Sequence, residues 1–216
     1  NISTLLAGIL NISPLTLTFN TANYATHQII TIQSVDNNSM GNQTDNVIIS
    51  VNDALSDNPF DPLPDINIPV TITNNDVASL VINPTSVTVA ENGTATFTVS
   101  LSARPASGNV VVDLISNNTA VATINLGQLT FTTLNWGVPQ TVTVTGVNNN
   151  TVLNTSTTIS LTVNNALSDD TFDGITGTVN VNVTNDDIAG FIVNPLAISI
   201  NEGGPAGQFT IVLTAQ

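Results

Sequence analysis

The sequence predicts an all-β protein made of tandem antiparallel β-sandwich repeats of about 111–112 residues, and three observations support this. Hydrophobic residues make up 41% of the 216 residues but aromatic residues only 4%, so a core would consist mainly of Val, Ile, Leu and Ala. The abundant Thr, Val and Ile favour strands, whereas the abundant Asn favours turns. Apolar and polar residues alternate, and long stretches of the sequence recur.

The alternation has a period of two rather than 3.6, which predicts strands and no helix. In residues 95–102, Phe97, Val99 and Leu101 fall on one face and Thr and Ser on the other. The same alternation occurs at residues 140–145, 158–163 and 178–184. Short strands separated by clusters of Asn, Gly, Pro and Asp predict a sandwich of seven to nine strands.

The repeat is clearest in one six-residue segment, because residues 52–57 (NDALSD) return as residues 164–169 (NNALSD), 112 positions later. Further matches at an offset of 112 or 111 are residues 17–19 with 129–131, Tyr24 with Trp136, Phe60 with Phe172, residues 73–76 with 184–187, and Glu91 with Glu202. A register kept over so many positions predicts one repeated structural unit. We expect the recurring Phe131 and Phe172 to point into its core.

Three segments follow from this repeat. Residues 77–187 form one complete β-sandwich repeat, residues 1–76 the C-terminal two-thirds of another, and residues 188–216 the N-terminal strands of a third. The sequence is therefore expected to be part of a longer array.

Charge excludes several classes of partner. The chain has one Lys or Arg against 15 Asp and Glu, a net charge of −14. Nucleic acid is excluded because phosphate neutralisation needs Lys and Arg. No run of about 18 apolar residues could span a bilayer, so direct membrane insertion is not expected. The absence of Cys excludes disulfides and thiolate chemistry.

One family resemblance rests on an ordered set of segments. These are residues 89–99 (VAENGTATFTV), 129–131 (LTF), 135–136 (NW), 139–144 (PQTVTV) and 181–187 (VNVTNDD). In this order they resemble the Calx-β and related Ig-like tandem repeats of large bacterial extracellular adhesins and surface fibres. The resemblance implies an Ig-like β-sandwich, tandem stacking, an extracellular location at the cell surface, and in some members calcium at the domain ends.

The calcium that the resemblance implies would be held by Glu91, Asp186 and Asp187, with Asp76 at the corresponding place in the first repeat. Calcium requires six to eight oxygen ligands. The family's acidic mid-repeat loop is residues 147–150 (VNNN) here and has no carboxylate, although its counterpart keeps one. The alternative is that these Asp and Asn residues only form turns between strands. The same two interpretations apply to Asp169, Asp170 and Asp173 and to the earlier Asp57, Asp61 and Asp65.

Catalysis is not expected from this sequence. His27 is the only His, and Pro139 takes its place in the next repeat. No Ser or Thr has a base near it in a recognisable arrangement, so no nucleophile is indicated. We therefore expect a protein that is not an enzyme and has no cofactor other than calcium.

The leading functional hypothesis is a secreted structural repeat segment of a long extracellular fibre or adhesin stalk, acting as a rigid spacer or filament building block. Its partners would be neighbouring repeats of the same chain. One alternative is a subunit of a self-assembling filament, in which residues 188–216 supply a neighbouring identical subunit with the strands that residues 1–76 lack. Only the strand around residues 109–112 would then have no replacement. The second alternative is a calcium-binding β-sandwich module.

Overall fold

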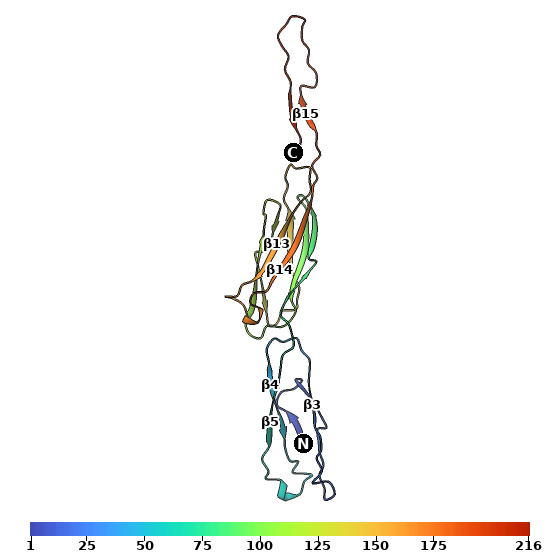
Figure 1. Ribbon diagram of the computed structural model, residues 1–216, viewed down its shortest axis with the longest axis vertical. Coiled ribbons are helices and arrows are strands. Elements are labelled where there is room, and N and C mark those ends of the chain that lie inside the picture. The colour runs from blue at the N-terminus through green and yellow to red at the C-terminus, as the bar shows by residue number, and fades with distance from the viewer. The chain divides into compact units, whose positions relative to one another are not determined.

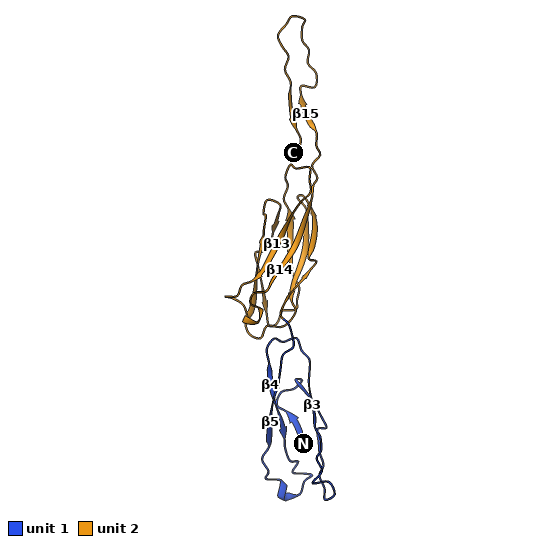
Figure 2. Cartoon of the chain, in the orientation of Figure 1, with its two compact units in different colours: residues 1–77 blue, residues 78–216 orange.

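The computed structural model describes residues 1–216 and is essentially all β (Figure 1). The chain divides into two compact units, residues 1–77 and residues 78–216, which Figure 2 colours separately. This division lies one residue beyond Asp76, and residues 188–216 belong to the second unit. None of the helices has the length and apolar character needed to cross a bilayer.

The second unit contains the complete sandwich, with nine strands in two sheets, in agreement with the predicted fold class. The four-stranded sheet has the order β10 (Ala122–Ile124), β12 (Gln140–Gly146), β8 (Thr94–Leu101) and β6 (Leu80–Asn83). The five-stranded sheet has the order β11 (Gln128–Thr132), β9 (Asn109–Ser116), β13 (Thr155–Val163), β14 (Thr176–Thr184) and β7 (Ser86–Ala90). Neighbouring strands are antiparallel except β14 and β7, which are parallel. The second strand of the repeat, β7, is therefore joined directly to the last, β14.

The core of this sandwich follows the alternation in the sequence. Phe97, Val99 and Leu101 of β8 are buried, and the Thr and Ser residues between them are more exposed. Phe131 on β11 and Phe172 in the short helix η2 (Asp170–Phe172) are fully buried. The predicted inward positions of the three Phe side chains are thus confirmed.

The first unit has a smaller core. Its three-stranded sheet has the order β1 (Ile2–Thr4), β4 (Gln43–Ile49) and β5 (Ile66–Ile72), and β2 (Leu10–Ser13) pairs with β3 (Thr31–Ser34). Ile2, Leu10 and Val47 form the buried cluster, with partly buried aliphatic side chains around them. Few side chains in this unit are fully enclosed, because it has fewer strands than the complete sandwich.

The elements of the first unit correspond to those of the second at the spacing found in the sequence. At a spacing of 112 residues, β2 corresponds to β10, β3 to part of β12, β4 to part of β13, and η1 (Asn58–Phe60) to η2. The last strand of the first unit, β5, matches β14. Residues 1–77 contain no counterpart of β6, β7, β8 or the first half of β9.

A missing partner strand also changes local structure in the first unit. Residues 17–19 repeat the Leu-Thr-Phe sequence of β11 but form no strand. In the complete sandwich β11 pairs with residues 109–113 of β9, and all of these except Asp113 have no counterpart here. Phe19 is consequently 54% exposed, whereas Phe131 is 0% exposed. The two repeats therefore have the same local structure only where the pairing strands are present in both.

Residues 188–216 contain a hairpin of β15 (Phe191–Asn194) and β16 (Thr210–Leu213). Phe191 is opposite Leu213 in this hairpin, as Leu80 is opposite Leu101 in the complete sandwich. The hairpin thus has the register of β6 and β8, but most of its side chains are exposed.

We predict that Phe172→Ala lowers the free energy of unfolding of the second unit by about 3–5 kcal/mol, because it leaves a cavity in a closed core. Ile115→Ala, on the exposed face of β9, should change it by less than about 1 kcal/mol. Urea unfolding followed by the fluorescence of Trp136, the only Trp, measures both values. Equal effects of the two substitutions would contradict the assigned strand faces.

Candidate metal centre

Glu91 directly follows β7, where the chain turns into β8. Asn92 has a positive φ of 57°, which Asn tolerates better than most residues, and this closes the turn. The Glu91 N–H donates a hydrogen bond to the carbonyl oxygen of Thr184, the last residue of β14, at 3.2 Å, which continues the parallel pairing beyond the end of β7. A Cβ at Gly146 would lie 2.5 Å from the Ala90 carbonyl oxygen, so only glycine allows β12 to approach this turn. These contacts place Glu91 beside the residues that follow β14.

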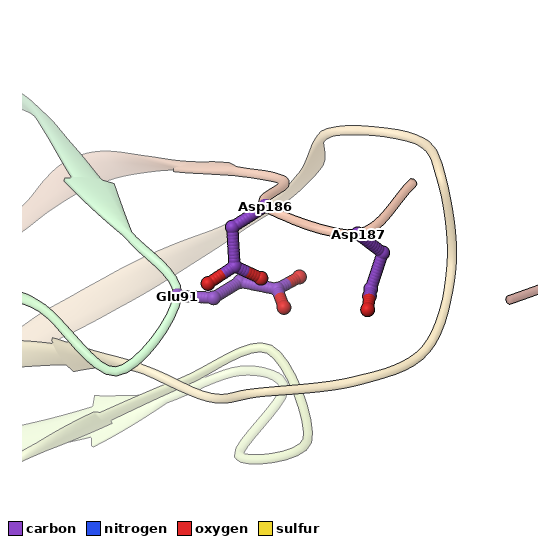
Figure 3. A group of neighbouring side chains, drawn as sticks. All are labelled: Glu91, Asp186 and Asp187. Atoms are coloured by element: carbon purple, nitrogen blue, oxygen red, sulfur yellow. The ribbon is translucent and has the colours of Figure 1, made fainter. Parts of the chain in front are cut away.

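Three carboxylates come together at this point. Glu91, Asp186 and Asp187 each contribute one oxygen to a group in which all these oxygens lie within 4.8 Å of one another (Figure 3). Two oxygens that both bind calcium at about 2.4 Å can be at most about 4.8 Å apart. Two unit charges at such a distance repel by roughly 3 kcal/mol at an effective dielectric constant of 20. A divalent cation at the centre would turn this repulsion into attraction.

Neutral side chains orient the group. The backbone N–H and the side-chain amide of Asn149 donate to the two carboxylate oxygens of Glu91, at 3.2 and 2.6 Å. The backbone N–H of Asp187 donates to Asn185 Oδ1 at 2.9 Å, which fixes the turn. Asp187 Oδ2 is buried and accepts no hydrogen bond. This oxygen is the acceptor in the group that a bound cation could satisfy.

The family resemblance points to the three carboxylates, and the structure adds a role for Asn149. Residues 147–150 contain no carboxylate, yet Asn149 in this loop holds the buried Glu91, which is 5% exposed. The only available signal was the position of the loop in the family pattern. An Asn can take part here because its side-chain NH2 group donates hydrogen bonds to a carboxylate, and its side-chain oxygen can also ligate a cation.

Asp76 lies in the first unit, outside the group of three carboxylates. Its backbone N–H donates to Asn74 Oδ1 at 3.1 Å, in the same type of turn as that before Asp187. Asp36, Asn37 and Asp76 line one depression in the surface of this unit. Asp36 stands where the complete repeat has Asn148, so the first unit has two carboxylates here but no counterpart of Glu91.

Asp169 has a different role. One of its carboxylate oxygens accepts hydrogen bonds from the backbone and hydroxyl of Thr171, at 2.9 and 2.5 Å. The other accepts from the backbone and hydroxyl of Ser107, at 2.5 and 3.4 Å. Asp169 therefore caps η2 and ties it to the turn before β9. Its counterpart Asp57 makes no such cap, because Pro59 stands where Thr171 would donate an N–H.

The remaining acidic residues of that pattern do not assemble into a group of three carboxylates. Those exposed to solvent are Asp57, Asp65, Asp170 and Asp173, whereas Asp61 is half-buried. The sequence presented this set and the Glu91 group as equally ambiguous, but only the latter brings its carboxylates together.

The comparisons with known proteins do not place the chain in a family. No family model and no curated protein matches the chain. Among solved structures it is similar to the E. coli chaperone DraB, with a TM-score of 0.38 and 10% sequence identity. The match covers 53% of this chain and 59% of the chaperone chain, so it spans less than two-thirds of the length of the chaperone chain.

If calcium binds to Glu91, Asp186 and Asp187, it should raise the melting temperature of the second unit. A 100-fold excess over Kd stabilises a folded protein by about 2.7 kcal/mol. Glu91→Gln with Asp187→Asn should abolish the rise, because it removes two of three charged ligands. Asp170→Asn with Asp173→Asn is the matched control and should retain it. No rise in the parent protein, measured by calorimetry with and without calcium, would exclude this site.

Acid should also weaken the second unit through Asp169. Burial of this carboxyl opposes ionisation, but the hydrogen bonds from Thr171 and Ser107 outweigh burial and lower its pKa below the ordinary value of 3.8. The resulting stabilisation is present above the ordinary pKa and is lost as the pH falls through the lowered pKa of the folded state.

Asp169→Asn should accordingly reduce stability at pH 7 and flatten its decline below about pH 4. Unfolding by urea at a series of pH values measures both effects, and Asp170→Asn serves as the control at an exposed neighbour. An unchanged pH profile in Asp169→Asn would show that these hydrogen bonds do not stabilise the ionised form.

Proposed function

We propose that the chain is a structural repeat segment of an extracellular fibre or adhesin stalk at a cell surface, in which each β-sandwich repeat serves as a spacer or filament building block. The observation that carries this proposal is the return of the same elements at an offset of 111 or 112 residues, down to the three-residue helices η1 and η2. Recurrence of whole sandwiches is typical of proteins in which each repeat contacts chiefly its neighbours.

The connections between repeats support the same function. Residues 73–79 join β5 to β6, and residues 185–190 join β14 to β15. These connections are no longer than ordinary loops between strands, so they add no separate linker between repeats. A net charge of −14, with one Lys or Arg, would also keep neighbouring arrays apart by repulsion.

A calcium-binding β-sandwich module is the second candidate function, and the Glu91 group favours it. Asp186 and Asp187 lie in the connection that leads out of the repeat, whereas Glu91 lies near its start. A cation held by all three would tie this connection to the sandwich. Calcium would then stiffen the junction between repeats, which is compatible with a role in a stalk.

Labelling of intact cells tests the leading function. An antibody raised against residues 78–187 should decorate the surface of unpermeabilised cells that make the chain, with gold particles recurring along filaments in electron microscopy. An antibody against a cytosolic enzyme is the control and should label only permeabilised cells. Labelling that requires permeabilisation would contradict an extracellular fibre.

A further inference from the structure

Unit 1 presents the open inner faces of a sandwich. Ile68 on β5 is 41% exposed, whereas the corresponding Val179 of the complete sandwich is 0% exposed. Phe60 is 55% exposed, and its counterpart Phe172 is 0% exposed. These side chains are uncovered because residues 1–77 have no counterpart of β6, β7 and β8, whose equivalents close the complete core.

Residues 188–216 present the complementary surface. Ile211 on β16 is 54% exposed, whereas the corresponding Val99 on β8 is 0% exposed. Phe209 and Leu213 are exposed too, although their counterparts Phe97 and Leu101 are buried. Residues 1–77 therefore expose an inner face that these strands would cover, and residues 188–216 expose the apolar side of the corresponding strands.

The complete sandwich shows how the two surfaces fit. There β8 pairs with β12 and β6 pairs with β8, so a hairpin of these two strands extends one sheet. The β15–β16 hairpin already has the β6–β8 register. Residues 28–30 of unit 1 correspond to the N-terminal half of β12, which pairs with β8 in the complete sandwich. They form no strand, because unit 1 has no β8 counterpart to pair with them.

We propose that residues 191–213 of one copy of this chain complete unit 1 of a second copy by strand addition. This assigns a partner to the proposed fibre function, on which it rests. Carried over from β8 and β12, the register places Thr210 opposite Ile29 and Phe209 opposite Ile30 of the second copy. Apolar side chains of both copies then meet on the inner face, and main-chain hydrogen bonds join the edges.

The other sheet is completed in the same way. Residues 197–201 correspond to β7 and would lie parallel to β5, with Ile198 beside Val70 and Ile200 beside Ile72. The outer edge of β5 is unpaired in the structure, because β4 is its only neighbour. Edge strands with open hydrogen-bonding groups accept additional strands readily.

Three positions make the fit looser than in the complete sandwich. Pro69 has no N–H where Asn180 donates to the Thr85 carbonyl oxygen, so one hydrogen bond of the β5 edge is absent. Ser34 and Ile66 replace Gly146 and Gly177, two positions where an added Cβ contacts a neighbouring strand closely. The joint between copies must therefore widen at these points, which makes it weaker than the bonds within one sandwich.

Sedimentation velocity of residues 1–216 over a range of concentrations tests the pairing. We expect reversible association, weakened at least about 10-fold by Ile211→Asp, because this charge would be buried at the joint. Ile192→Asp is the matched control on the same hairpin. Its counterpart Val81 is 46% exposed in the complete sandwich, so this charge should remain in water and leave association within about threefold.

A disulfide trap tests the register, since the chain contains no Cys. One copy carries Ile29→Cys, and a second copy with a larger tag carries Thr210→Cys. Oxidation of the mixture should give a crosslinked heterodimer. Thr31→Cys mixed with Thr210→Cys, displaced by two residues along the strand, should not, because the Cβ atoms of a diagonal pair are about 7 Å apart.

Each outcome decides the proposal. A chain that stays monomeric at all concentrations overturns it, while the surface-labelling result for the fibre function would still stand. Equal loss of association in both Asp variants, or equal crosslinking by both Cys pairs, indicates nonspecific apolar contact and overturns it too. Association lost only with Ile211→Asp, together with crosslinking only in the aligned pair, supports it.

Discussion

The parallel pairing of β7 with β14 is the interaction on which the complete sandwich depends. It joins the first third of the repeat to the last, and it places Val87 and Val89 on the same core as Val181 and Val183. Where this partner is missing, the same sequence pattern no longer gives a closed core. β5 has the alternation of β14, yet its apolar side chains remain partly or largely exposed.

The same pairing creates the candidate metal centre. Glu91 and Asp186 are far apart in the sequence, and they meet because β7 ends beside the end of β14. The site is therefore a property of a completed repeat rather than of any short motif. A partial repeat such as unit 1 retains Asp76 and its turn but has no counterpart of Glu91.

Hydrogen bonds from neutral groups take the place of ion pairs in this protein. With one Lys or Arg against 15 carboxylates, salt bridges cannot satisfy the acidic side chains. Asn149 instead orients Glu91, and Thr171 with Ser107 satisfies Asp169. Such bonds fix loop geometry without adding positive charge, so the surface remains strongly acidic.

The sequence by itself determined the fold class, the repeat and the faces of the strands. These depend on local alternation and on self-similarity, both of which can be read without knowing any partner, and the buried Phe97 and Phe131 agree with them. The three carboxylates of the candidate site were indicated only through the family resemblance. Only the tertiary structure decided whether residues 17–19 form a strand, what Asn149 contacts, and that Asp169 caps a helix whereas Asp57 does not. The physical reason is that strand formation and carboxylate hydrogen bonding need a partner segment, and that partner is brought near only by pairing between distant parts of the chain.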